Sequence, residues 1–441
     1  MRSLSAQRAG YAANVPGYCL SRPLARRPPG VVGPQEPRAV KKMSTSVATN
    51  HAAPFGRYET AASDATEPRR RIPELDGVRA IAIWMVFVTH GVFGFPNAPG
   101  ALDRVPGPLM LGVRAGWLGV DLFFLLSGFL ITGILVDAKD GPKYFRNFYT
   151  RRALRIMPLY FACILVWSFF YTNARSYFLL SAVFGANLCY LLGVPEPKGP
   201  DVLWSLAVEE HFYLLWPIVV LVTSRRVLFA LSATIFVVTP CLRGWAASRG
   251  MDPGVIYLLS WFRFDGLAGG AMLALWARSP ACSPRFANRL AVALLLFDVL
   301  LSACMYKFGL SGSRIPAVAL RYTQAYLLFG AFFVFVFAHT GSRWTAPLRW
   351  RVMQISGALS YCVYLVHFTV GVGYEAVVAR SGWSPVAALG PSGALVARLC
   401  AMAIVSFGIA AFSRRYFDGP ILALKDRLAP VAPTAAASAP G

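Results

Sequence analysis

Long apolar runs separated by short polar loops dominate residues 75–416 of this 441-residue chain. A helix that crosses a bilayer needs about 20 predominantly apolar residues, and these runs approach that length. The runs are continuous in Leu, Val, Phe and Ala, whereas strands of a membrane barrel alternate in polarity over about ten residues. The pattern therefore predicts an all-α polytopic membrane protein with about ten transmembrane helices, at 80–97, 116–136, 155–172, 203–222, 227–243, 255–276, 290–305, 320–338, 355–378 and 393–412.

Composition agrees with this prediction. The chain is 56% hydrophobic and only 14% charged, and its mean hydropathy of +0.52 lies outside the range of soluble globular proteins. The net charge of +23 does not indicate nucleic-acid binding, because the Lys and Arg residues lie in short loops beside apolar spans. The eight cysteines are scattered without a CxxC pair, so neither a disulfide framework nor a zinc site is predicted.

The distribution of basic loops predicts the orientation. Residues 139–155 contain six Lys or Arg residues, which favours the cytoplasmic side. The stretch 176–193 is nearly long enough to cross; if it crossed, Arg225 and Arg226 would lie outside. If it is re-entrant or interfacial instead, all later basic loops fall inside. We therefore predict that it does not cross and that both termini are cytoplasmic.

The chain divides into three parts. Residues 1–72 are rich in Arg, Pro, Ala and Ser without an apolar signal-peptide core, which predicts a disordered cytoplasmic tail in which Met43 is a possible true start. Residues 73–416 form the predicted transmembrane domain. Residues 417–441 are expected to be a short flexible cytoplasmic tail.

Ionisable residues interrupt the first two spans. In "LDGVRAIAIWMVFVTH" Arg79 opens the apolar run, and His90 lies eleven residues later, roughly 16 Å further along a helix. An imidazole in the membrane is either a hydrogen-bonded structural group or a proton-transfer group, and we favour proton transfer. Asp121 in "GWLGVDLFFLLSGF" lies at a similar level, so it either orients His90 or caps the N-terminal end of its own helix. Ser127 is expected only to allow close packing.

Three arginines lie at the predicted cytoplasmic entrance of the third span, in "YTRRALRIMPLYF": Arg151, Arg152 and Arg155. Arg151 and Arg155 share one helix face because they are four residues apart. Closely spaced guanidinium groups suit phosphate, which arginine binds through paired hydrogen bonds. The other interpretation is that they fix topology and contact lipid headgroups.

Two further spans carry polar stripes. In "LWSLAVEEHFYLLWP" Glu209 shares a face with Ser205 and Tyr213, and it either enters the bundle as a functional carboxylate or forms a salt bridge with Arg263. In "SYCVYLVHF" the side chains of Ser360, Tyr364 and His367 line one face. For His367 a packing role is favoured over catalysis, because no acid lies near it in the sequence.

Taken in order, these motifs resemble the acyltransferase-3 family of membrane O-acyltransferases between residues 75 and 416. The set comprises "LDGVRAIA" followed by His90, "GVDLFFLLSGF", "RRALRIMP", "WSLAVEE" followed by "FY", "RFDGLAGGAMLA" and "SYCVYLVHF". His211 departs from the family, in which Gln is frequent at this position. The chain resembles the stand-alone form, without the hydrolase-like domain to which the family is often fused.

The resemblance implies transfer of an acyl group, most often acetyl, from cytoplasmic acyl-CoA to a hydroxyl of an extracytoplasmic or lipid-linked saccharide at a bacterial inner membrane. Because the thioester is already activated, no metal or redox cofactor is expected. A histidine with an ordinary pKa near 6.5 suits deprotonation of the acceptor, and either direct transfer or an acyl-histidine fits. The roles expected are phosphate binding by Arg79, Arg151, Arg152 and Arg155, base catalysis by His90, orientation of His90 by Asp121, and acceptor binding or proton relay by Glu209.

A proton-coupled transporter or flippase is the alternative from another class, because buried His, Asp, Glu and Arg side chains also occur in carriers. Internal repeats would favour a carrier. None is evident in this sequence, since the "RRALR" and "SLAVEE" segments each occur once.

Overall fold

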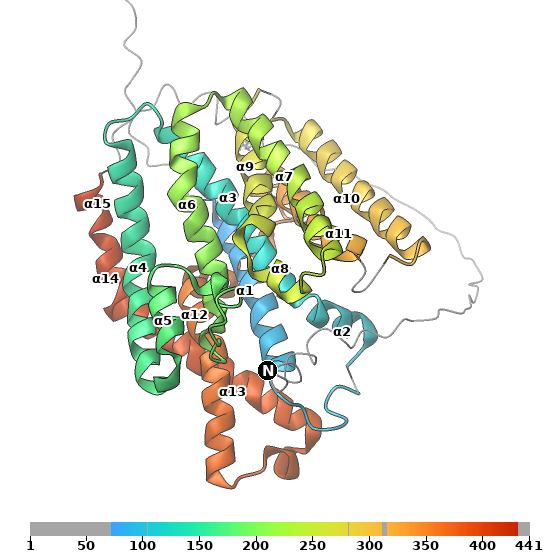
Figure 1. The fold of residues 1–441 in the computed structure, drawn as a ribbon, viewed down its shortest axis with the longest axis vertical. Helices are drawn as coiled ribbons and strands as arrows, with labels where there is room; N and C mark the ends of the chain where they lie inside the picture. Colours follow the sequence, from blue (N-terminus) through green and yellow to red (C-terminus); the bar gives the residue numbers. More distant parts are fainter. Residues whose placement is uncertain (1–71, 104, 281, 311–314, 431–441) are drawn as a thin grey trace, which may run out of the picture. The chain divides into compact units, whose positions relative to one another are not determined.

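The computed structural model describes residues 72–103, 105–280, 282–310 and 315–430. Residues 1–71 of the predicted N-terminal tail, including Met43, therefore lie outside the described residues. In the described part every regular element is helical, which confirms the all-α prediction (Figure 1). The α-helices are α1 (Pro73–Phe93), α2 (Gly107–Arg114), α3 (Gly119–Ala138), α4 (Tyr144–Phe170), α5 (Arg175–Ala182), α6 (Leu203–Val222), α7 (Arg225–Ser248), α8 (Pro253–Leu258), α9 (Phe264–Trp276), α10 (Pro284–Lys307), α11 (Ile315–Ala338), α12 (Arg351–Ser381), α13 (Pro385–Tyr416), α14 (Asp418–Ala423) and α15 (Lys425–Leu428).

Nine helical segments among the described residues are long and apolar enough to cross a membrane. They match nine of the ten predicted spans. The tenth, predicted at 255–276, is instead broken into α8 and α9 by the turn at Ser260–Phe262, and α9 has only 13 residues. At 1.5 Å per residue α9 is about 20 Å long, shorter than the roughly 30 Å hydrocarbon core. The cytoplasmic placement of both termini stays a prediction.

The stretch 176–193 does not form a spanning helix. It contributes the eight-residue helix α5 and then a single turn at Ala186–Leu188. The hydroxyl of Tyr160 in α4 donates to the carbonyl oxygen of Ser181 at 2.8 Å, which holds α5 beside α4 (Figure 1). This structure agrees with the prediction that the segment does not cross.

Close glycine contacts join α3 to α9 at the centre of the bundle. A Cβ atom on Gly128 would lie 1.9 Å from the carbonyl oxygen of Leu267, and one on Gly270 would lie 2.0 Å from that of Leu125. Only glycine permits such backbone approach, as is common at membrane helix interfaces. The pairing of these helices brings the polar residues of α3 against those of α9.

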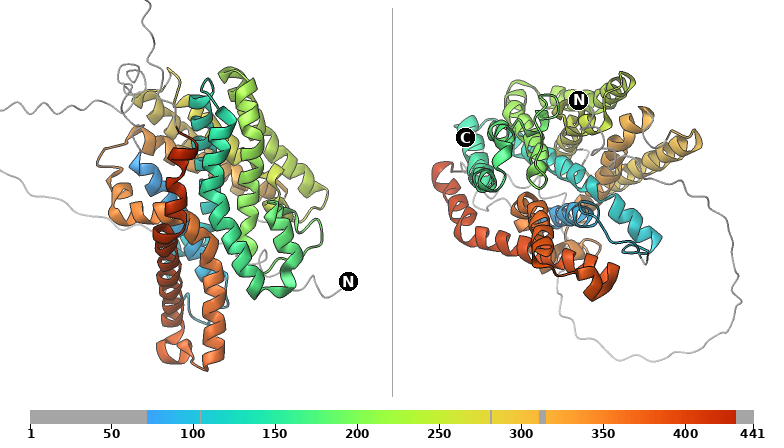
Figure 2. Two further views of the ribbon diagram at one scale, coloured as in Figure 1. Left: turned by 90° about the vertical axis from the view of Figure 1, so that its left-hand side faces the viewer. Right: turned by 60° about the horizontal axis from the view of Figure 1, so that its bottom comes forward.

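A second close pair is α1 with α12. A Cβ atom on Gly357 would lie 2.0 Å from the backbone oxygen of Asp76, so these helices cross with their backbones almost in contact. Figure 2 shows α12 running antiparallel beside α13, to which it is joined through Gly382, a residue with a φ of 68°.

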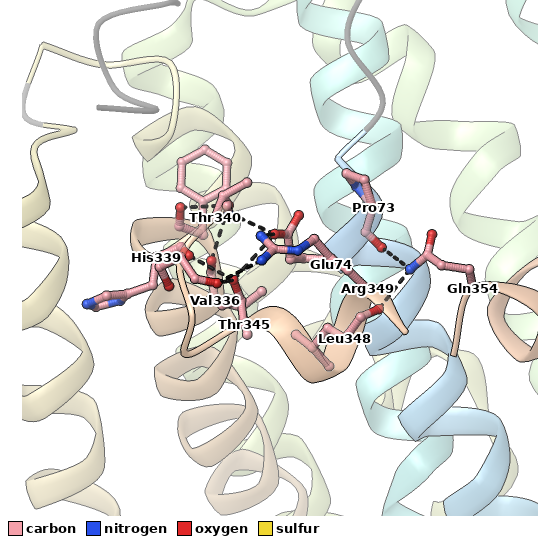
Figure 3. Close-up of polar contacts among 12 residues, drawn as sticks. Pro73, Glu74, Val336, His339, Thr340, Thr345, Leu348, Arg349 and Gln354 are labelled. Carbon is pink, nitrogen blue, oxygen red and sulfur yellow. Dashed lines mark hydrogen bonds and ion pairs between the residues drawn. The ribbon is translucent and has the colours of Figure 1, made fainter. Parts of the chain in front are cut away.

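A buried carboxylate fixes the start of α1 (Figure 3). One oxygen of Glu74 accepts from the backbone N–H of Gly341 at 2.8 Å and from the guanidinium of Arg349 at 2.9 Å. Nearby, the side-chain amide of Gln354 in α12 donates to the carbonyl oxygen of Pro73 at 2.8 Å. These bonds set the longitudinal register between α1 and α12, the helices that carry His90 and His367.

The chain after α13 differs from the predicted flexible tail. Residues 418–428 form the short helices α14 and α15, which lie against α4. The guanidinium of Arg151 donates to the carbonyl oxygen of Ala429 at 2.8 Å and to the carboxylate of Asp426 at 3.1 Å. Residues 431–441 lie outside the described part of the chain.

Candidate active site

A cavity of about 110 Å³ lies between α1, α3, α4, α6 and α12. It combines cationic, acidic and hydroxyl side chains, which separate spans bring together. Its lining residues are Arg79, Val120, Phe123, Phe124, Leu126, Ser127, Leu130, Ile131, Arg152, Arg155, Ile156, Ser205, Leu206, Glu209, Tyr213, Ser360, Tyr361 and Tyr364.

Three of the four predicted phosphate-binding arginines line this cavity. The guanidinium of Arg79 forms a salt bridge with the carboxylate of Asp76, one turn earlier on α1, at 2.7 Å. Arg152 places its guanidinium over the ring of Tyr213, 5.3 Å from the centroid. Among the described residues neither Arg152 nor Arg155 forms a salt bridge. Two guanidinium groups without a carboxylate partner therefore face a cavity, and such groups attract an anion.

Arg151 does not line the cavity, contrary to its predicted grouping with Arg155. It turns towards the C-terminal segment, where Asp426 and the Ala429 carbonyl accept its hydrogen bonds. The face of α4 that reaches the cavity is the one shared by Arg152 and Arg155, three residues apart.

The side chain of Glu209 lines this cavity, and its functional role stays a prediction. The hydroxyl of Tyr213, one turn further along α6, donates to Glu209 Oε2 at 2.9 Å. The hydroxyl of Ser127 in α3 in turn contacts that of Tyr213. Ser127 was expected only to pack, but it extends this hydrogen-bonded chain. The salt bridge predicted between Glu209 and Arg263 is not formed, because Arg263 pairs with Asp121.

His90 is held by a second histidine. Its Nδ1 lies 2.7 Å from Nε2 of His367, and the two rings are nearly coplanar at 4°. His90 is half-buried, whereas His367 is fully buried. His367, for which a packing role was favoured, thus directly contacts the predicted base.

The backbone around His367 determines which nitrogen carries the proton. Nδ1 of His367 lies 2.8 Å from the carbonyl oxygen of Tyr364 and 3.0 Å from that of Val363. Carbonyl oxygens only accept, so Nδ1 of His367 donates and its Nε2 carries the lone pair when the ring is neutral. Nδ1–H of His90 then donates to that lone pair. Nε2 of His90 is thereby left as the basic nitrogen.

The two histidines do not line the arginine cavity, but Tyr364 lies between the two groups. Its ring centroid is 5.9 Å from that of His367, and its hydroxyl bonds to the hydroxyl of Ser205 at 2.6 Å. Both Tyr364 and Ser205 line the cavity. Tyr364 thus contacts His367 on one side and lines the arginine cavity on the other.

Asp121 does not contact His90, so the predicted orienting role is wrong in its geometry. The carboxylate of Asp121 forms an ion pair with Arg263, the residue directly before α9, at 2.5 Å. A second ion pair joins Arg243 to Asp265 at 2.8 Å. All four side chains are fully buried. The close α3–α9 packing turns Asp121 towards α9, where an arginine neutralises it. Arg263 also lies over the ring of Tyr322, 3.9 Å from its centroid.

Metal-binding groups do not stand out. Within the described ranges, no cluster of three or more His, Cys, Asp and Glu side chains could hold a metal ion.

Sequence comparison relates the chain to a known protein family. Residues 72–412 match the sequence profile of the acyltransferase-3 family, described as an acyltransferase domain. YrhL of Bacillus subtilis is 29% identical over 69% of this chain and 49% of its own length. The peptidoglycan O-acetyltransferase OatA of Listeria monocytogenes is 25% identical over 68% of this chain and 50% of its own. The O-acetyltransferase OatA of Staphylococcus aureus is 24% identical over 68% and 51%.

The chain thus spans about half the length of the curated relatives it matches. No solved structure matches the chain.

Proposed function

Since the chain belongs to the acyltransferase-3 family and is an integral membrane acyltransferase, we propose that it transfers an acetyl group from acetyl-CoA to a hydroxyl of an extracytoplasmic or lipid-linked saccharide. OatA of Listeria monocytogenes is named as a peptidoglycan O-acetyltransferase and OatA of Staphylococcus aureus as an O-acetyltransferase, which supports both the acetyl donor and a saccharide acceptor. The chain spans about half the length of these relatives, so their acceptor comes to this chain only as part of the proposal.

Donor binding is assigned to the arginine cavity. Arg152 and Arg155 have no carboxylate partner among the described residues and face the cavity together with Arg79. Guanidinium groups bind phosphate oxygens through paired hydrogen bonds, and CoA carries several phosphates. At about 110 Å³ the cavity is small for a whole cofactor, for which sites of about 300–1,000 Å³ are usual. We therefore place the phosphates at its arginine end and only the acyl-pantetheine arm further inside.

Acceptor activation is assigned to His90. Its Nε2 takes the proton of the acceptor hydroxyl while the hydroxyl oxygen attacks the thioester carbonyl carbon. The carbon–sulfur bond then breaks, and the CoA thiolate leaves and is protonated, so an ester and free CoA result. His367 holds His90 in the required tautomer and stabilises the imidazolium as it forms, a positioning role like that of the carboxylate in a catalytic triad. An acyl group carried transiently on His90 is the alternative order of the same steps.

The Tyr364–Ser205 pair is proposed as the passage between these two regions. For the thioester to reach His90, the hydroxyl–hydroxyl bond has to open. Glu209, held by Tyr213 and through it by Ser127, is proposed to bind the acceptor or donor by hydrogen bonds or to relay protons within the cavity. Asp121 is assigned to the buried ion-pair network and not to the reaction.

The observation that carries the proposal is the combination of Arg152 and Arg155, which form no salt bridge in the described part of the chain and face a cavity, with a histidine pair beside Tyr364. The purified protein in lipid vesicles should convert labelled acetyl-CoA and a saccharide acceptor into labelled ester and free CoA. A transporter or flippase, the alternative from another class, would move the saccharide across the vesicle membrane without consuming the thioester. Saccharide movement without release of free thiol would contradict the proposed function.

A further inference from the structure

A second hollow, of about 610 Å³, lies where α12 and α13 meet α1. It shares no lining residue with the arginine cavity and plays no part in the reaction proposed above. The residues that line it are mostly apolar: Trp84, Arg351, Val352, Ile355, Ser356, Ala403, Ile404 and Phe407. We refer to this hollow as the α12–α13 groove.

Among the polar side chains of the α12–α13 groove, Trp84 and Ser356 bond to each other, whereas Arg351 has no bonding partner among the described residues. The indole N–H of Trp84 donates to the hydroxyl of Ser356 at 3.1 Å, so this pair is bonded within the protein. Arg351 is exposed, and within the described residues no ion pair or hydrogen bond engages its side chain. Arg349, two residues earlier, is instead bound by Glu74. The groove therefore offers an apolar surface with one available guanidinium at its rim.

The groove begins at the N-terminal end of α12. Arg351 is the first residue of this helix, and Gln354 of its first turn bonds to Pro73, the first residue of α1. The indole of Trp84 reaches Ser356, five residues after Arg351 and thus roughly 7–8 Å further along α12. Half of a typical hydrocarbon core is about 15 Å. The apolar lining next to Arg351 therefore covers about half of that depth.

The residues around Arg351 are typical of a membrane interface. Trp350, next to Arg351, is 61% exposed, and Trp344 is 64% exposed. Exposed tryptophans collect at the level of lipid headgroups, where arginine side chains meet phosphate. A molecule that fills the groove accordingly needs an apolar chain and an anionic head.

We propose that the α12–α13 groove is a binding site for an anionic phospholipid, with one acyl chain in the groove and the phosphate on Arg351. The chain would pack on Trp84, whose ring stacks on that of Phe407 at 5.1 Å. Trp84 lies between Arg79 and His90 on α1, and Ser356 lies on the helix of His367. The lipid therefore supports, from behind, the two helices that hold the histidine pair, and this binding does not depend on which reaction the site performs.

The test uses the full-length purified protein in an uncharged detergent. Thermal unfolding is followed while dioleoyl phosphatidylglycerol or dioleoyl phosphatidylcholine, which have the same chains, is added. Phosphatidylglycerol should raise the melting temperature at about fivefold lower concentration, the effect of one basic residue near an anionic headgroup. Arg351→Gln should abolish this preference, whereas Arg225→Gln, an exposed arginine outside the groove, should retain it.

Filling the groove separates this site from general lipid solvation. Ile404→Trp should weaken stabilisation by both lipids, because the side chain would occupy the space of the acyl chain. Equal effects of the two lipids on the unaltered protein, or a preference that survives in Arg351→Gln, would overturn the proposal. Arg351 is on the surface, so its substitution should leave folding intact and the result interpretable.

Discussion

Replacing His367 by Ala should reduce the turnover number while leaving substrate binding almost unchanged. In the structure Nε2 of His367 accepts a hydrogen bond from Nδ1–H of His90. This bond leaves Nε2 of His90 as the base. Without it, His90 loses both the partner that selects its tautomer and the group that stabilises its charged form. The predicted loss thus concerns the reaction step and not the arginine cavity.

The size of the effect follows from the change in this one bond. A hydrogen bond between neutral groups contributes about 1 kcal/mol, and one to a charged group about 1.5–3 kcal/mol. The difference, about 0.5–2 kcal/mol, is the part lost only in the transition state, which corresponds to a roughly 2- to 30-fold lower kcat. Removal of the base itself should cost more, about 10²- to 10⁴-fold. His90→Ala should therefore be much less active than His367→Ala.

Steady-state kinetics with labelled acetyl-CoA on purified variants measures this ordering. His367→Gln serves as the conservative variant, because its amide oxygen can accept from Nδ1 of His90 and should restore part of kcat. His211→Gln is the matched control: His211 is a membrane histidine bonded to Ser260 at 2.8 Å and lies outside the cavity lining. It should keep kcat and both Michaelis constants.

A kcat in His367→Ala equal to that of the unaltered enzyme would refute this reasoning. So would a loss that appears only in KM for the donor, since that would make His367 part of donor binding. A merely structural role would lower the amount of folded protein in His367→Ala without changing kcat per folded molecule.

Three further outcomes are expected. Arg152→Lys should raise KM for acetyl-CoA severalfold with a smaller change in kcat, because Lys restores the charge but not the paired hydrogen bonds. Arg151→Lys should leave KM unchanged, since Arg151 lies outside the cavity lining. Equal effects of the two substitutions would show that the two arginines do not differ in donor binding. Asp121→Asn should lower the melting temperature strongly, as breaking a buried ion pair costs about 3–5 kcal/mol, yet retain most of kcat per folded molecule. Cysteines introduced at Lys143 and Gly250 should react with an impermeant maleimide only in opened cells and in intact cells, respectively, and equal labelling would overturn the proposed topology.

Sequence alone predicted the parts of the fold that depend on local pattern. Nine spans were predicted because an apolar run of sufficient length suffices to identify a membrane helix. The helix broken at 260–262 was not, since Arg263 and Asp265 were interpreted as polar islands within a span and not as the start of a half-length helix. The helices α14 and α15 were missed because their short sequence carries no strong periodicity.

Within the site, contacts between residues close in the sequence could be predicted, and contacts between distant helices could not. The bond from Tyr213 to Glu209 connects residues four apart on one helix, so their shared face was predictable. The direction of Asp121 around its helix depends on α3 packing against α9, which the local sequence does not show. The contact between His90 and His367 joins residues 277 positions apart and requires knowledge that α1 lies against α12. No local pattern contains that pairing.

For Arg151 the sequence allowed two faces of α4. Pairing with Arg155 at four residues and pairing of Arg152 with Arg155 at three are equally compatible with helix geometry. The C-terminal segment decides between them, because Asp426 and Ala429 bind Arg151 and leave the other face to the cavity.

The central claim, that His90 is the base of an acetyl transfer whose donor is held by the arginine cavity, is tested most directly by measuring transfer and donor binding on one variant. His90→Ala in lipid vesicles should bind acetyl-CoA with an unchanged Kd, while formation of labelled saccharide ester falls by about 10²- to 10⁴-fold. Undiminished ester formation by this variant would contradict the account.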